Sequence, residues 1–160
     1  MYKFPKDLYA DVRIEETSSS NIYIKNGEVE NNIAISSIGA IVRVYDGEMW
    51  YSSVTNDIAA IQDEIDNLTQ LAKPNPGIWD DPMVRNLEVN QAALLIYDGD
   101  NDLRKVSRDR KMQLLDELIA DCVDENIPEI NTWEAFYNDT HIVKRFYSGK
   151  GAAITQDRQA

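Results

Sequence analysis

Residues 9–54 decide the fold, and they read YADVRIEETSSSNIYIKNGEVENNIAISSIGAIVRVYDGEMWYSSV. Apolar and charged residues alternate in the opening segment ADVRIE, which is the period-two pattern of a half-buried strand. The dipeptides Asn26-Gly27 and Asp46-Gly47 each interrupt a pattern of this kind. Both are typical of tight hairpin turns, which need residues that tolerate positive φ. The stretch therefore predicts antiparallel strands connected by hairpins.

Two further breaks are expected inside this stretch. The polar run at residues 17–21, TSSSN, predicts a turn between two strands. Ile35 has an odd number, whereas Val42 and Val44 have even numbers. A bulge at or before Gly39 would place both sets on the same face of a strand, since one extra residue reverses the facing of all that follow.

A helix is predicted at residues 57–72. Apolar side chains recur there every three or four positions, and either Asn56 or Thr55 can cap the first turn. Residues 74–90 begin with the run PNPGIWDDP, in which proline and glycine interrupt regular structure. We expect this segment to connect two regions of the chain.

The second region resembles the first in its mixture of elements. A short apolar run at residues 92–97 predicts a strand, and a broad apolar stripe at residues 107–125 predicts a helix. The remaining sequence predicts three strands, broken at residues 138–139 and at residues 149–151.

The order of these elements predicts an α+β fold. It consists of antiparallel sheets that are each packed by a helix, in the approximate order ββββα and then βαβββ. Residues 1–73 form the first hairpin sheet with its helix, residues 74–90 the Pro-rich connection, and residues 91–160 the strand-helix-three-strand unit.

Charge and composition exclude several classes of partner. The 160 residues include 28 acidic and 16 basic side chains, which gives a formal net charge of −12. Such a chain is poorly suited to bind phosphates, so neither a nucleic acid nor an anionic membrane is expected as a partner. The single cysteine forbids an intrachain disulfide, and no apolar run approaches the roughly 20 residues of a membrane helix. We expect a cytoplasmic protein.

The residues that could carry chemistry are few. His141 is the only histidine, and Cys122 is expected to be a buried, inert thiol on the apolar side of a helix. Zinc-site spacing cannot be assembled from one histidine and one cysteine, and we expect His141 to be a surface or partly buried strand residue. Residues 98–102, DGDND, resemble the start of a calcium loop, but Leu103 occupies the position that needs glycine. We therefore expect a plain strand-to-helix turn, and no catalytic, cofactor-binding or metal-binding residue in this chain.

Three collinear segments resemble the TldD/PmbA family, proteins once named modulators of DNA gyrase. The first is YADVRIEET…IYIKNGEVENN…SSIGAIVRVYDGEMWYSSVTND, which is similar to the opening region of the family. The second is VSRDRKMQLLDELIADC, similar to a Val-Ser-x-x-x-Lys helix, and the third is the hairpin ending at SGKG. The matches extend from about Tyr9 to Gln156. The chain departs from the family pattern at residues 147–151, where an Asn-Ser pair is missing.

The resemblance singles out two arginines. Arg13 and Arg43 stand in alternating strands and match arginines of the family pattern. They are expected either to pair with strand carboxylates such as Glu15 or Glu30, or to help seat a catalytic domain or a partner subunit. The full set of expected assembly or structural residues is Arg13, Gly27, Gly39, Arg43, Gly47 and Gly151.

The resemblance also implies a function. Active family members are similar to zinc peptidases with a His-Glu-x-x-x-His helix and a later cysteine, and this chain contains neither element. It implies a dimer that encloses a zinc site and is fed by unfolded peptides. We therefore expect a non-catalytic N-terminal region of a peptidase subunit, with the catalytic C-terminal domain and its zinc outside this chain. On this interpretation the sequence is a piece of a longer protein; a natural short form is the alternative.

Two other functions are alternatives to the peptidase-subunit interpretation. The first is the equivalent region of a metal-free partner or regulatory subunit, which would look similar in sequence. The second is an acidic DNA mimic that acts on gyrase, prompted by the old family name and the charge of −12. The mimic is disfavoured because the acidic residues alternate with apolar ones, as they do on ordinary solvated faces.

Overall fold

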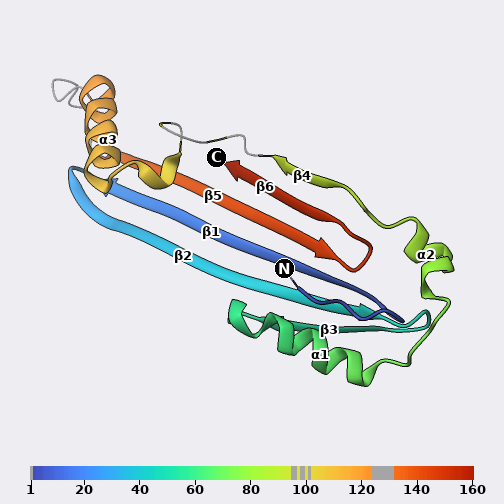
Figure 1. Cartoon of the computed structure of the whole chain (residues 1–160). Helices are drawn as coiled ribbons and strands as arrows, with labels where there is room; N and C mark the ends of the chain where they lie inside the picture. The colour runs from blue at the N-terminus through green and yellow to red at the C-terminus, as the bar shows by residue number, and fades with distance from the viewer. Residues whose placement is uncertain (1, 95–96, 98–99, 101, 124–131) are drawn as a thin grey trace. The chain divides into compact units, whose positions relative to one another are not determined.

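The computed structural model describes residues 2–94, 97, 100, 102–123 and 132–160, and it confirms the mixed α+β class. Its strands form a six-stranded sheet in the order β3-β2-β1-β5-β6-β4 (Figure 1). The strands are β1 (Tyr9–Lys25), β2 (Glu28–Tyr45), β3 (Trp50–Thr55), β4 (Gln91–Leu94), β5 (Glu134–Ser148) and β6 (Ala153–Gln159).

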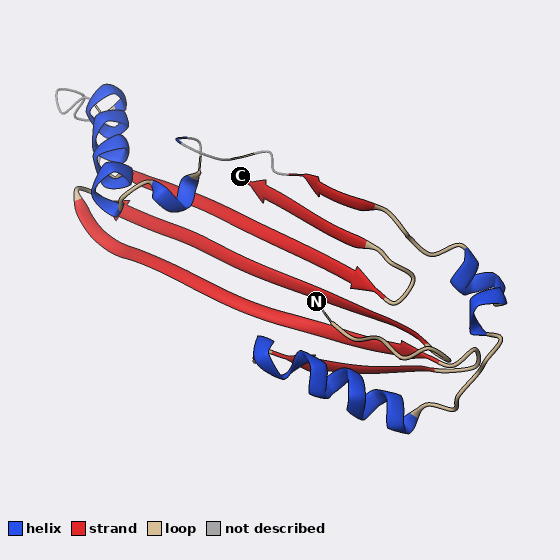
Figure 2. Ribbon diagram, viewed as in Figure 1, coloured by secondary structure: helices blue, strands red, loops and turns tan. Residues whose placement is uncertain are grey.

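The helices are short compared with the strands, as Figure 2 shows. They are α1 (Ile61–Leu71), α2 (Pro82–Arg85) and α3 (Arg108–Cys122). Single 3₁₀ turns at Ile58–Ala60, Ile78–Asp80 and Leu103–Lys105 precede them.

The chain divides into two compact units. Unit 1 comprises Met1–Glu16, Ile38–Ile96 and Val143–Asp157, and unit 2 comprises Thr17–Ser37, Tyr97–Ile142 and Arg158–Ala160. The strands β1, β2 and β5 therefore contribute residues to both units. The predicted division into residues 1–73, 74–90 and 91–160 separates consecutive stretches of the chain, whereas each compact unit combines several stretches. The predicted division stays a prediction.

Unit 1 has its core between the strands and α1. Val12 and Val42 are fully buried and pack with Ile61 and Ile65 of α1, which lies beside β3 (Figure 1). Alternate residues of each strand point to one face, so the period-two pattern of the sequence supplies this core directly. Each buried aliphatic side chain of this kind contributes about 1.5–3 kcal/mol.

Both predicted hairpin turns are confirmed. Asn26 and Gly27 have φ values of 48° and 84°, as a tight turn between β1 and β2 requires. At the second turn Gly47 has a φ of 103°, and Asp46 Oδ1 accepts hydrogen bonds from the backbone of Glu48 and Met49. The pairing of β2 with β3 is antiparallel and runs from Ala40 opposite Thr55 to Tyr45 opposite Trp50.

Two predicted breaks are wrong, because β1 continues through residues 17–21 and β5 continues through residues 138–139. The polar side chains that suggested turns are satisfied across neighbouring strands instead. The hydroxyls of Ser18 and Ser36 hydrogen-bond to each other, and Asn21 donates to Asn138. The second region therefore contains two long strands after α3, where three were expected.

The premise of the predicted bulge is also wrong. It assumed that the isoleucines of early β2 are buried with Val42 and Val44, but Ile33 and Ile35 are 48% and 59% exposed. No reversal of facing is needed to accommodate them.

Two local predictions need correction and one is confirmed. The turn before α1 is capped by Asp57, which accepts from the backbone N–H of Ala59, and not by Asn56 or Thr55. Cys122 is exposed, because it ends α3. The helix predicted at residues 107–125 is confirmed by α3, and Ser107 caps its first turn by accepting from the backbone N–H of Arg110.

Gly47 and Gly151 provide a test of how tightly the second hairpin is packed. Both have positive φ, but a Cβ at Gly47 would lie 2.5 Å from Nδ2 of Asn75, whereas a Cβ at Gly151 meets no atom within 4 Å. We expect Gly151→Ala to lower the free energy of unfolding by about 1 kcal/mol, and Gly47→Ala to lower it by at least about 1 kcal/mol more. Urea unfolding measures both losses, and equal losses would contradict the close approach of Asn75.

Candidate functional site

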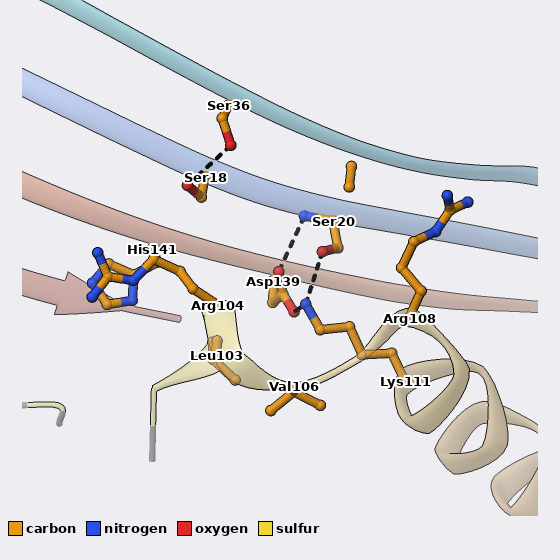
Figure 3. Close-up of a pocket in the computed structure, with 11 residues that line it drawn as sticks. Ser18, Ser20, Ser36, Leu103, Arg104, Val106, Arg108, Lys111, Asp139 and His141 are labelled. Carbon is orange, nitrogen blue, oxygen red and sulfur yellow. Dashed lines mark hydrogen bonds and ion pairs between the residues drawn. The ribbon is translucent and has the colours of Figure 1, made fainter. Parts of the chain in front are cut away.

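The candidate functional site is a cavity of about 230 Å³ in unit 2, where polar and charged side chains stand beside Ala34, Leu103 and Val106. Five elements supply its polar walls (Figure 3). Serine hydroxyls come from β1 and β2, Lys111 and Arg108 from α3, Asp139 and His141 from β5, and Arg104 from the 3₁₀ turn before α3.

At the centre of this cavity lies a buried ion pair. The Lys111 Nζ is 2.6 Å from Asp139 Oδ2 and donates to the Ser20 hydroxyl at 2.8 Å. Asp139 also accepts from the Tyr137 hydroxyl at 2.8 Å and from the backbone N–H of Ser20 at 3.1 Å. Because Lys111 is only 6% exposed, its charge depends on these partners for compensation.

The electrostatics of this pair follow from burial and hydrogen bonding. Burial works to raise the pKa of Asp139, but hydrogen bonds from Lys111 and Tyr137 outweigh it and hold that pKa below its usual value. Burial, reinforced by the hydrogen bond to Asp139, raises the pKa of Tyr137 to about 12. Asp139 is therefore a carboxylate and Tyr137 a neutral phenol throughout the physiological pH range.

A second polar group contains His141, which is 2% exposed and 3.4 Å from Asp102 through Nδ1 and Oδ1. Asp102 is held by Arg104, whose Nε and Nη2 each lie 2.9 Å from a carboxylate oxygen. Hydrogen bonding to Arg104 lowers the pKa of Asp102 to about 2 against the opposing effect of burial. His141 is thus more buried than the sequence suggested, and its neighbour is a permanently charged carboxylate.

Asp102 belongs to the acidic run that resembled a calcium loop. Its side chain caps the 3₁₀ turn by accepting from the backbone N–H of Arg104, as a strand-to-helix connection requires. Residues 98, 99 and 101 of that run lie outside the described residues, so the other positions of the loop stay untested.

Lys111 and Asp139 were not among the predicted site residues, although the sequence contains one signal for Lys111. Lys111 precedes Leu115 and Ile119 by four and eight residues, so it lies on the apolar face of α3. A charged residue on a buried stripe predicts a buried partner. Lys111 is also the lysine of the Val-Ser-x-x-x-Lys segment, in which Ser107 caps the helix.

Of the expected assembly or structural residues, Arg43 has the most defined environment. Its Nη2 and Nε lie 2.6 and 2.9 Å from the Asp11 carboxylate, which is 1% exposed, and its guanidinium stacks 4.7 Å from the Trp50 ring. Arg43 therefore pairs with a carboxylate of the neighbouring strand, as one of the two expectations held, but the partner is Asp11 and not Glu15 or Glu30. Hydrogen bonding to Asp11 raises the pKa of Arg43, so the pair stays charged.

The other members of that set lie outside the cavity. Arg13 lies in unit 1 with its guanidinium 5.8 Å from the ring of Phe146, and Gly39 lies within β2. Gly151 turns the chain between β5 and β6, where its neighbour Lys150 donates to three carbonyls at the end of α2. Lys150 therefore connects the turn between β5 and β6 to the end of α2, at a position where the chain departs from the family pattern.

The chemistry open to the cavity is limited to binding and charge stabilisation. Within the residues that the structure describes, no group of three or more histidine, cysteine or acidic side chains could hold a metal ion. Among the same residues no helix is long and apolar enough to cross a membrane.

Comparison with known proteins gives two kinds of match. Residues 10–73 match the model of PmbA/TldA metallopeptidase domain 1. A comparison with curated proteins finds no match. Among solved structures, a candidate modulator of a DNA gyrase from Thermotoga maritima has a TM-score of 0.68 at 12% identity over 95% of this chain and 34% of that chain.

Two further structures share the fold. A candidate modulator of DNA gyrase from Bacteroides thetaiotaomicron has a TM-score of 0.64 at 17% identity over 94% of this chain and 35% of that chain. TldE from Thermococcus kodakarensis has a TM-score of 0.62 at 10% identity over 94% of this chain and 34% of that chain. The chain spans about a third of the length of these three structures.

These matches define the class of protein: an α+β domain that resembles domain 1 of PmbA/TldA metallopeptidases. Residues 10–73 match the first domain of this family, and the resemblance inferred from the sequence motifs is confirmed. The relatives are multi-domain proteins, and this chain carries the first domain.

Removing one partner of the central ion pair tests its energetic role. We expect Lys111→Met to lower the free energy of unfolding by about 3 kcal/mol, because the Asp139 carboxylate would stay buried without its cation. The matched control is Arg110→Ala on the same helix, whose pair with Glu117 is exposed and contributes less than about 1 kcal/mol. Urea unfolding compares the two, and a loss for Lys111→Met no larger than that for the control would contradict this account.

The pKa of Asp102 generates a pH dependence. A carboxyl with a folded-state pKa of about 2 contributes stability that is present above its unfolded value of about 3.8 and disappears as the pH falls toward 2. We therefore expect Asp102→Asn to be destabilised relative to wild type at pH 5–7, with the difference shrinking between about pH 4 and pH 2. Chemical unfolding at a series of pH values measures this difference, which a constant gap at every pH would contradict.

Proposed function

We propose that this chain is the non-catalytic N-terminal region of a TldD/PmbA-type metallopeptidase subunit. Its role is to support assembly of that enzyme and the access of unfolded peptides to a zinc site located outside this chain. The match of residues 10–73 to the first domain of the family supports the assignment to such a subunit. The surface of unit 2 supports the role in assembly, and the sheet edges support the role in peptide access.

The observation that carries the assembly role is a sheet face with exposed apolar side chains and few charges, called the open face of unit 2. The opposite face is occupied by α3, where Leu115 packs on Ile22 and Ile24. The open face consists of Thr17, Ser19, Asn21, Tyr23 and Lys25 of β1, Val29, Asn31, Ile33 and Ile35 of β2, and Glu134, Phe136, Asn138, Thr140 and Ile142 of β5.

Cross-strand contacts establish that these residues share one face. The side-chain amide of Asn31 donates to Asn21 at 2.9 Å, and that of Asn21 donates to Asn138. The Tyr23 and Phe136 rings stack at 4.6 Å with an angle of 4° between their planes. Alternation along each strand then places the remaining members beside them.

The composition of this face is unusual for the chain that carries it. Charged residues make up 28% of the sequence, but the described part of the open face carries only two, Lys25 and Glu134, which pair with each other at 3.4 Å. Ile35 and Phe136 are 59% and 57% exposed, and Val29 and Ile33 are exposed to a similar extent. Exposed apolar area with few charges is typical of the centre of a protein–protein interface. We assign this face to the contact with the catalytic domain or the partner subunit.

The sheet edges support the peptide role. In the strand order β3 and β4 stand at the two ends, and all four residues of β4 are exposed. An extended peptide can add to an edge strand through backbone hydrogen bonds with little demand on its sequence. That mode of recognition suits the unfolded peptides that the proposed enzyme would take.

The alternative is the equivalent region of a metal-free partner subunit. This fold serves both interpretations, since TldE and the two candidate gyrase modulators match it with similar TM-scores. Reading the gene beyond this chain separates them. A His-Glu-x-x-x-His sequence in frame supports the peptidase, and a long continuation without it supports the partner.

Light scattering over a range of protein concentrations tests the assembly role. The chain alone presents the open face to solvent, so we expect its average mass to rise with concentration. The double variant Ile35→Asp, Phe136→Asp places two carboxylates on the open face, and we expect it to remain monomeric. Both side chains are exposed, so the fold should tolerate the change.

The matched control is Leu71→Asp, which adds a carboxylate at an exposed apolar position at the end of α1. It should associate as the wild type does. A wild-type chain that stays monomeric at all concentrations would contradict the assigned interface, as would a double variant that associates as strongly as the control.

A further inference from the structure

Several hydrogen-bond donors that line the cavity of unit 2 have no assigned acceptor in the described part of the chain. The Lys111 ammonium has three N–H groups, of which two reach Asp139 Oδ2 and Ser20 Oγ. Ser20 accepts that bond, so its own hydroxyl hydrogen is left to donate. The Ser18 and Ser36 hydroxyls lie 3.2 Å apart, and since one donates to the other, one hydrogen of this pair also needs an acceptor.

Asp139 is the carboxylate among the lining residues, and its bonds go to other groups. Its Oδ1 accepts from the Ser20 backbone, and its Oδ2 accepts from both Lys111 and Tyr137. Among the residues that the structure describes, no acceptor is assigned to the third Lys111 hydrogen or to the two serine hydrogens. These hydrogens are therefore available to a ligand that carries acceptor oxygens.

The charges around the cavity also favour an anionic ligand. Arg104 and Lys111 are matched by Asp102 and Asp139, respectively. Arg108 at the rim donates to the side-chain and backbone oxygens of Asn32, which are uncharged. Its positive charge is therefore not neutralised by a carboxylate of the described residues. A local surplus of one positive charge is notable on a chain of net charge −12.

We propose that this cavity binds a small oxyanion of the carboxylate or phosphate type. Lys111, Ser20 and the Ser18–Ser36 pair donate to its oxygens, and Arg108 supplies the compensating charge. A cavity of about 230 Å³ is large enough for such an ion with part of its hydration. This site is independent of the proposed role in assembly, because it lies on the α3 side of the strands and uses none of the open-face residues.

Thermal unfolding and titration calorimetry of the full chain test the proposal, with inorganic phosphate and acetate as separate probes. Sodium chloride keeps the ionic strength constant, because exposed charges are screened by salt. We expect at least one of the two anions to raise Tm and to bind with measurable heat. The phosphate and acetate arms distinguish a tetrahedral from a planar ligand.

Arg108→Ala is the informative variant, since the side chain is at the rim and its loss should leave the fold intact. We expect it to weaken binding about tenfold, the usual effect of losing one charge-assisted hydrogen bond. Arg110→Ala, an exposed arginine on the same helix that pairs with Glu117, should bind as the wild type does. The proposal is overturned if neither anion acts beyond the chloride control, or if the two arginine variants weaken binding equally.

Discussion

The structure depends on the period-two alternation of β1 and β2, which assigns each residue to one of two faces. In unit 1 the even-numbered residues of these strands form the core, with Val12 and Val42 packed against α1. In unit 2 the even-numbered residues of β1 supply both Ile22 beneath α3 and the serines of the polar cavity. The odd-numbered residues of β1 and β2 in unit 2, together with even-numbered residues of β5, form the open face. One pattern in the sequence thus separates the core, the cavity and the proposed interface.

Two ion pairs favour one alignment of the strands and helices among those that hydrophobic packing alone would allow. Asp11 with Arg43 in unit 1, and Lys111 with Asp139 in unit 2, join residues that are far apart in the sequence. Such pairs contribute little net stability compared with apolar replacements, but they are costly to break, so they favour one register over its alternatives. Three of these four residues lie in segments that carry the family resemblance, which gives those motifs a structural explanation.

The two proposals use opposite faces of the strands in unit 2. The open face has exposed apolar side chains and few charges, as an interface core requires, whereas the cavity has donors with no assigned acceptor and an arginine without a carboxylate partner among the described residues. A domain without metal ligands among its described residues can still contribute to an enzyme through these two surfaces, by holding a partner and by binding an anion.

The sequence by itself determined the α+β class, the two hairpin turns and the beginning of α3, because alternation, Asn-Gly or Asp-Gly pairs and a serine cap act within a few residues. It misplaced breaks at residues 17–21 and 138–139, where polar residues bond across strands rather than turning the chain. Only the tertiary structure decided that Asp11 pairs with Arg43, that Lys111 meets Asp139, and that His141 is buried beside Asp102. These contacts depend on which strands become neighbours and in what register, and local sequence signals do not encode that choice.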